Sequence, residues 1–292
     1  MGGGAWTATT ATNFISSKYA DFGVRSFSDL DKLSTTQIYD VCGLDPALNP
    51  KGVIRECRDS AEHPNTFPII LGLDVTGSMG LATKRCASKL NDIMTELYGK
   101  VKDVEFMMMG IGDLAYDRAP IQVTQFESDV RILDQTTKIW FERGGGGNSF
   151  ESYTAAWYFG LNHTELDCWK RGKKGLIITM GDEPLNPYLP GEELDNTLDG
   201  QKNASLQNVN TNELYKKALE RFDIFHIAIT DQESSYEHYS SMIHDSWGKL
   251  LGQRCLYAKS DELPKVIGKI VDECVQSESP VVTTENDGGI SW

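Results

Sequence analysis

The chain has 292 residues, 40% of them hydrophobic and 24% charged, a composition that is ordinary for a globular protein with a buried core. Its formal net charge of -14 disfavours nucleic acid and anionic membrane surfaces as partners, because both repel an acidic protein. No apolar stretch is long enough to span a bilayer, and the N-terminus lacks the pattern of a secretory signal. Six cysteines without a Cys-x-x-Cys pair are typical of reduced core residues, so we expect a cytoplasmic protein.

Residues 1–66 have weak periodicity and are rich in Ser, Thr, Asp, Asn and Pro. The pattern allows short helices at 28–33 and 34–41. Tyr, Phe and Trp residues in this segment argue against full disorder. We therefore expect an N-terminal extension that packs on or near the domain that follows it.

Strands and helices alternate regularly over residues 67–276. Apolar runs predict strands at 67–73, 104–111, 121–126, 175–180, 224–229 and 254–258. Apolar residues at helical spacing predict helices at 86–97, 129–143, 150–166, 214–222, 236–250 and 263–274. Residues 181–210 are a long polar insertion, and residues 277–292 are a polar tail that we expect to be mobile. This order predicts an α/β, doubly wound fold, in which helices cover both faces of a mostly parallel sheet.

Oxygen-bearing side chains follow two of the predicted strands. Asp74, Thr76 and Ser78 lie on a tight turn between the first strand and a helix, and Asp182 follows the strand at 175–180. Ligands bind such sheets at the carboxyl ends of the strands, where these residues would meet. Carboxylates and hydroxyls are the hard ligands that Mg²⁺, Mn²⁺ or Ca²⁺ prefer. The sequence therefore predicts a divalent cation site at this edge.

At these residues the chain resembles the von Willebrand factor type A (vWA) domain. That family carries a metal-ion-dependent adhesion site (MIDAS) built from Asp-x-Ser/Thr-x-Ser, a Thr in a later loop, and an Asp after the fourth strand. Asp74, Thr76 and Ser78 match the first element and Asp182 matches the last. The order of elements resembles the family over roughly residues 67–275, and the pattern as a whole resembles a bacterial or phage branch.

One element departs from the family pattern. Where the family has Thr, this chain has four glycines at 144–147, followed by Asn148 and Ser149. Either residue could supply the neutral oxygen, and Glu151 could add a charge. A carboxylate there would make the ion less electrophilic toward an outside acid.

The resemblance implies a metal-dependent protein-binding module rather than an enzyme. Thr76 and Ser78 would bind the ion directly, whereas Asp74 and Asp182 would act through waters or hold the hydroxyls. Few directly bound carboxylates leave the cation under-neutralised, so an acidic side chain of a protein partner can complete its shell. The hydroxyl-rich set favours Mg²⁺ over Mn²⁺ or Ca²⁺.

Other interpretations remain open at this point. The chain could be a structural subunit of a larger assembly with a degenerate metal site. A haloacid-dehalogenase-like phosphatase also places an Asp after its first strand, and Asp74, Lys174 and Asp182 mimic its pattern. Such enzymes need a second Asp two residues after the nucleophile as general acid, where this chain has Thr76.

Three further polar residues are interpreted as structural. We assign Asp113 and Asp117, which follow the second predicted strand, to a solvated loop rather than to groups that support the metal ligands. His226 lies within a predicted strand, and we interpret it as a core residue.

Overall fold

Six strands build the central sheet, and all neighbours are parallel except β3 and β4, which run antiparallel at one edge. In spatial order they are β10 (Cys255–Ala258), β9 (Phe222–Ile229), β6 (Gly175–Gly181), β2 (Phe67–Asp74), β3 (Val104–Ile111) and β4 (Ile121–Val123). The computed structural model describes residues 5–39, 41–142, 147–200, 207–231 and 234–277. Every strand predicted from an apolar run is present, although β4 ends at Val123 rather than at residue 126.

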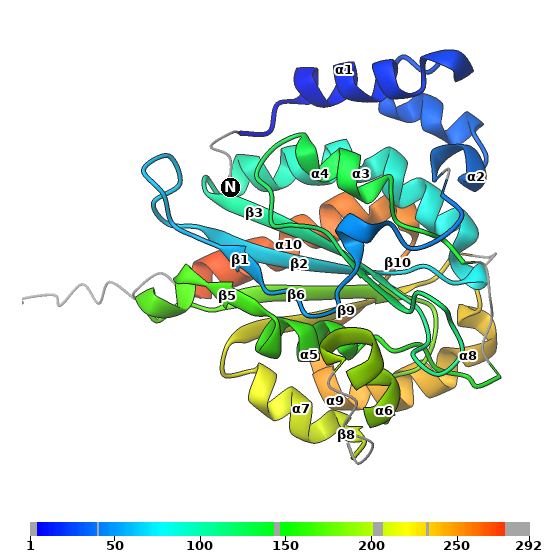
Figure 1. Cartoon of the computed structure of the whole chain (residues 1–292), viewed down its shortest axis with the longest axis vertical. Helices are drawn as coiled ribbons and strands as arrows, with labels where there is room; N and C mark the ends of the chain where they lie inside the picture. Colours follow the sequence, from blue (N-terminus) through cyan, green and yellow to red (C-terminus); the bar gives the residue numbers. More distant parts are fainter. Residues whose placement is uncertain (1–4, 40, 143–146, 201–206, 232–233, 278–292) are drawn as a thin grey trace, which may run out of the picture.

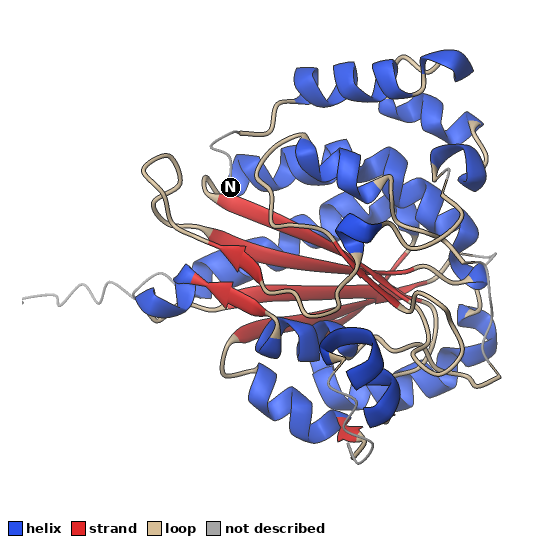
Figure 2. Ribbon diagram, viewed as in Figure 1, coloured by secondary structure: helices blue, strands red, loops and turns tan. Residues whose placement is uncertain are grey.

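Helices cover both faces of this sheet, which confirms the α/β, doubly wound prediction (Figures 1 and 2). Alternate strand residues enter two separate hydrophobic cores: Ile69 and Leu71 belong to the first, and Ile70 to the second. The helices of the first face are α3 (Gly80–Lys100), α4 (Arg131–Thr136) and α10 (Leu263–Ser277). Those of the second face are α5 (Ala155–Asn162), α6 (Gly191–Leu194), α7 (Thr211–Ala218), α8 (Tyr236–Ile243) and α9 (Lys249–Leu251).

Helix α3 begins directly after the turn that carries Thr76 and Ser78, and its apolar side packs onto the sheet. The face predicted for residues 86–97 is confirmed at Leu90, Ile93, Met94 and Leu97, all of which are buried in the first core. The side chain of Cys86 lies outside the described residues. None of the five described cysteines forms a disulfide. None of the helices within the described ranges has the length and apolar character needed to cross a membrane.

Two predicted helices are shorter than expected because tertiary hydrogen bonds take their backbone groups. The helix predicted at 129–143 is only α4, which ends at Thr136. The chain beyond it pairs with the Gln122 side chain, which donates to Trp140 O at 2.8 Å and accepts from Trp140 N at 2.8 Å. Such bonds hold the backbone beside β4 and prevent a further helical turn.

The helix predicted at 150–166 is also too long. It is only α5, and the residues before and after it belong to other structures. Glu151 forms an isolated bridge to Leu185, and Ser152 N donates to Gly112 O at 3.1 Å. Residues after α5 form β5 (Thr164–Leu166), which pairs in parallel with β1 (Arg55–Cys57).

The N-terminal residues lie across the first face, outside α3 (Figure 1). They form α1 (Ala8–Lys18), a 3₁₀ turn at Phe27–Lys32 and α2 (Thr35–Ile38). The turn and α2 match the short helices expected at 28–33 and 34–41, whereas α1 has no counterpart among the predictions. Ile15 and Leu30 are buried in the same core as α3, and Tyr19 donates a hydrogen bond to Ile38 O at 2.7 Å.

The polar insertion after Asp182 is folded where it is described. It contains α6, a π-helical turn at Asp195–Asp199 and a short antiparallel pair, β7 (Tyr188–Leu189) with β8 (Val209–Asn210). Residues 201–206 of this insertion are outside the described ranges, as is the tail that we expected to be mobile, from residue 278 onward.

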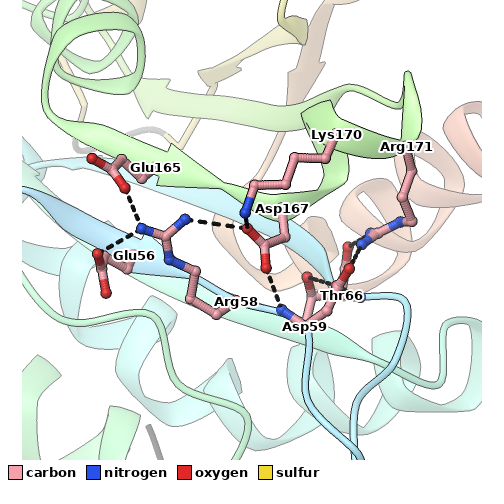
Figure 3. A network of polar contacts seen from close by, with 8 residues as sticks. All are labelled: Glu56, Arg58, Asp59, Thr66, Glu165, Asp167, Lys170 and Arg171. Carbon is pink, nitrogen blue, oxygen red and sulfur yellow. Dashed lines mark hydrogen bonds and ion pairs between the residues drawn. The ribbon is translucent and has the colours of Figure 1, made fainter.

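An ion-pair network fastens the β1–β5 pair to the body of the domain (Figure 3). Arg58 contacts Glu56, Glu165 and Asp167, and Asp167 also accepts a hydrogen bond from the Asp59 backbone at 3.0 Å. Arg171 pairs with Asp59 and donates to Thr66 O at 2.7 Å. The network ties the segment before β2 to the segment before β6, at the end of the sheet away from the predicted metal ligands.

Candidate metal centre

The predicted ligands lie at the carboxyl ends of two adjacent central strands. Asp74 is the last residue of β2, and Asp182 follows the last residue of β6. The register aligns Leu73 with Met180, so the two strands reach the same edge of the sheet together. Thr76 and Ser78 occupy the turn that leads from β2 into α3. This position is where parallel sheets bind ligands.

Hydrogen bonds join these four side chains in two pairs. Thr76 donates to Asp74 Oδ1 from its backbone N at 2.9 Å and from its hydroxyl at 2.6 Å. Ser78 Oγ donates to Asp182 Oδ1 at 3.0 Å, and the Thr76 and Ser78 hydroxyls lie 3.5 Å apart. The two hydroxyls therefore stand between two carboxylates, which orient them.

The loop at residues 144–152, which stands where the family carries its Thr and is called here the third-element loop, makes fewer contacts with these four residues in its described part. Asn148 is exposed, and its Nδ2 donates to Asp113 Oδ2 at 2.6 Å. Within the described residues, Ser149 makes no hydrogen bond to Thr76, Ser78 or Asp182. Residues 144–146 of the glycine run lie outside the described ranges. The assignment of Asn148 or Ser149 as a ligand therefore stays a prediction.

Further carboxyl groups surround the four residues. The assignment of Asp113 to a solvated loop is wrong, because its side chain is buried and Asp117 Oδ2 accepts a hydrogen bond from its backbone at 2.8 Å. Glu151 is also buried, and among the described residues its Oε2 has no hydrogen-bond partner. Glu183 follows Asp182 directly and is half-buried. The motif residues thus have other carboxyl groups as neighbours.

Burial and mutual repulsion raise the pKa values of these carboxyl groups. Burial raises the pKa of Asp74, and the negative charge of Asp182 raises it further. Burial likewise raises the pKa of Asp182. The pKa of Glu183 rises to about 8, through burial first and then through the charges of Asp74 and Asp182. Burial is also the largest cause of the raised pKa of Glu151, followed by the charge of Asp74. A bound cation would offset this repulsion.

The donor set fits a hard divalent cation. In the described part of the chain, no three His, Cys, Asp or Glu side chains are grouped so that they could hold a metal ion by themselves. An ion at this edge must therefore draw on the hydroxyls of Thr76 and Ser78, and on water, as well as on carboxylates. All of these ligands are oxygens, and Mg²⁺ commonly keeps several waters in its shell.

The site does not fit a phosphatase nucleophile. Asp74 is fully buried, and both of its oxygens accept hydrogen bonds, Oδ1 from Thr76 and Oδ2 from Tyr153. A nucleophilic carboxylate must reach its substrate. The position two residues later is a hydroxyl that donates back to Asp74, so it does not act as a general acid on a leaving group.

Two hydrogen bonds at the site involve residues that the motif does not include. Tyr153 Oη donates to Asp74 Oδ2 at 2.6 Å, and Ser235 N, just before α8, donates to Asp182 Oδ2 at 2.6 Å. Tyr153 falls in the segment predicted to be helical, and Ser235 is more than fifty residues from its partner. The position of Tyr153 directly after Glu151 and Ser152, in the third-element loop, was the available signal.

Comparison with known proteins gives similarity of fold only. No family model matches the sequence, and no curated protein matches it either. Solved structures that resemble the chain include the pilus adhesin SpaC from Lactobacillus rhamnosus GG in an open conformation, with 12% identity and a TM-score of 0.45 over 78% of this chain and 31% of SpaC. This chain therefore spans about a third of that adhesin's length.

Two smaller structures are covered almost completely. The vWF domain of the type V pili tip protein Mfa5 from Porphyromonas gingivalis has 11% identity and a TM-score of 0.44, over 77% of this chain and 98% of that domain. An aerotolerance-related membrane protein from Bacteroides fragilis has 12% identity and a TM-score of 0.41, over 71% and 99%. Identities and scores this low assign no function to the chain.

Proposed function

We propose that the chain is a vWA-type, non-enzymatic protein-binding module. It holds one divalent cation, preferably Mg²⁺, at the carboxyl ends of β2 and β6. Thr76 and Ser78 bind the ion through their hydroxyls, while Asp74 and Asp182 orient those hydroxyls or act through water. An acidic side chain of a partner protein replaces a water on the ion and completes both its charge and its coordination.

One observation carries this proposal: Thr76 donates to Asp74 and Ser78 donates to Asp182, while the two hydroxyl oxygens lie 3.5 Å apart. Two carboxylates that accept from two hydroxyls leave the hydroxyl lone pairs free for a cation. Carboxylates that accept a hydrogen bond from a metal ligand fix the orientation of that ligand and strengthen it as a donor to the ion. The motif match to the family's first and last elements agrees with this geometry.

The surroundings of the site support a protein partner. The insertion after Asp182 begins beside the site, where Leu185 bridges to Glu151. Loops on a rigid sheet are where binding specificity is usually found. We also propose a reducing, cytoplasmic setting, which is supported by the lack of disulfides among the five described cysteines.

The proposal is tested by the metal dependence of partner capture. The immobilised chain is exposed to proteins of its own cells in Mg²⁺ and is then washed with EDTA. We expect a partner that EDTA releases and that the Ser78→Ala variant fails to retain. Ser88→Ala is the matched control, because Ser88 lies buried in α3 and, among the described residues, its hydroxyl donates to the backbone at Arg85 O. It should retain the partner as the unmodified chain does.

The chemistry of the contact is tested on the partner that is found. Changing one Asp to Asn or one Glu to Gln at its contact should abolish capture, because a neutral amide does not balance the cation's charge. Capture that ignores both EDTA and Ser78→Ala would contradict the proposal. It would favour a structural subunit whose metal site is degenerate.

A further inference from the structure

Tyr153 makes a contact at the candidate site that the motif does not include. Its side chain is fully buried, and its hydroxyl donates to Asp74 Oδ2 at 2.6 Å. The other oxygen of Asp74 already accepts from Thr76. Tyr153 and Thr76 therefore hold the two ends of one carboxylate. Because a carboxylate with both oxygens bonded cannot rotate freely, the Thr76 hydroxyl is fixed as well.

Aromatic packing fixes the ring that carries this hydroxyl. The Tyr153 ring meets the rings of His226 and Trp247 edge-on, with centroids 5.3 and 5.8 Å away. His226 and Trp247 stack on each other at 3.8 Å, and Trp247 Nε1 donates to Glu183 O at 3.2 Å. Trp247 thus contacts both the Tyr153 ring and the backbone beside Asp182. The packed rings of Tyr153, His226 and Trp247 therefore contact Asp74 through the Tyr153 hydroxyl and the backbone beside Asp182 through Trp247.

Gly181 gives the hydroxyl room to reach Asp74. A Cβ atom at this position would lie 2.1 Å from Tyr153 Oη and 2.4 Å from two of its ring carbons. Any other residue would therefore push the ring away from the carboxylate. Gly181 directly precedes Asp182. Tyr153 therefore lies close to the backbone beside Asp182 while its hydroxyl bonds to Asp74.

We propose that Tyr153 is a positioning residue for the cation, which acts by holding Asp74 so that the Thr76 hydroxyl faces the ion. This inference rests on the proposed metal site and adds a residue to it. A purely structural role would affect folding stability alone. The positioning role also affects metal affinity, because disturbing a group that orients a ligand typically lowers metal affinity by about 10- to 100-fold.

The chain offers a matched control at Tyr19. It is also buried and donates a hydrogen bond of 2.7 Å, but to a backbone carbonyl, Ile38 O, in the N-terminal segment. Both Tyr153→Phe and Tyr19→Phe remove one buried hydroxyl and one hydrogen bond. Calorimetric titration with Mg²⁺ should show an affinity at least about tenfold lower for Tyr153→Phe and unchanged for Tyr19→Phe.

A spectroscopic measurement on the unmodified chain keeps the inference testable if Tyr153→Phe does not fold. With ¹³C at the tyrosine ζ-carbons, Mg²⁺ should shift the Tyr153 signal, because its hydroxyl is bonded to Asp74. The Tyr19 signal should stay in place. Equal Mg²⁺ affinity of Tyr153→Phe and the unmodified chain, or a Tyr153 signal that ignores Mg²⁺, would overturn this inference and leave the proposed function intact. An unmodified chain that binds no Mg²⁺ would instead overturn the proposed function.

Discussion

At the scale of single residues, His226 shows how burial lowers the pKa of a histidine. It lies in β9 between Trp247, which stacks on its ring, and Thr179, whose Oγ1 lies 2.9 Å from Nδ1. Burial lowers its pKa from 6.5 to about 3. The interpretation of His226 as a core residue agrees with this full burial. Its ring is neutral in the folded chain over the whole physiological range.

The lowered pKa of His226 predicts a loss of stability in acid. Between pH 6.5 and 3 the unfolded chain binds a proton that the folded chain does not, so the free energy of unfolding falls as the pH falls through this window. At pH 5.5, one unit below the ordinary value, the loss is about 1.4 kcal/mol. The raised pKa values of Asp74 and Glu183 act in the opposite direction in this window, so the loss is measured as a difference between two proteins. Urea unfolding at pH 7.5 and 5.5 should give a change in the free energy of unfolding that is less favourable by this amount in the unmodified chain than in His226→Gln. An equal change in both proteins would contradict the assignment.

The candidate site was predictable where its chemistry is local in sequence. Asp74, Thr76 and Ser78 share one turn, and Asp182 follows from the rule that parallel strands end at one edge. The partners supplied by tertiary structure were not predictable in this way. Tyr153 reaches Asp74 only because the loop before α5 folds back against Gly112, and Asp113 is buried by that same loop.

At the scale of elements, strands were predicted more accurately than helices. The inner strands are buried on both faces, so their apolar runs are continuous and their ends are sharp. Helices α4 and α5 are shorter than their periodic segments, because Gln122 and the insertion near Leu185 bind the flanking backbone instead. Periodicity reports which face is buried and not where tertiary hydrogen bonds end the helix.

The N-terminal segment offers a test at this scale. Ile15 of α1 is 2% exposed and packs into the core around α3, whereas Ile54, before β1, is 48% exposed. Ile15→Ala should lower the free energy of unfolding by about 2–5 kcal/mol, because it leaves a cavity. Ile54→Ala should change it by less than about 0.5 kcal/mol. Urea unfolding of both variants should remain a single transition. A separate early transition for Ile15→Ala would mean that α1 does not unfold with the domain.

At the scale of the whole molecule, the hydrophobic cores lie on the two faces of the sheet and the candidate site lies at one edge. Two hydrophobic cores hold the helices on its faces, while Asp74, Thr76, Ser78 and Asp182 lie at its carboxyl edge. Tyr153, which donates to Asp74, belongs to the second core, so the site and that core are in direct contact. The formal net charge of -14 attracts cations and repels anions, and the carboxyl groups at this edge, whose negative charges raise one another's pKa values, add to that field when they are ionised.

The central claim is that this edge binds one divalent cation through Asp74 and its neighbours. Calorimetric titration with Mg²⁺, and in parallel with Mn²⁺, tests it most directly on the unmodified chain and on Asp74→Ala. We predict one binding site in the unmodified chain and none in the variant, with both proteins folded by circular dichroism. Equal binding by both proteins would place the ion elsewhere, and no binding by either would contradict the claim.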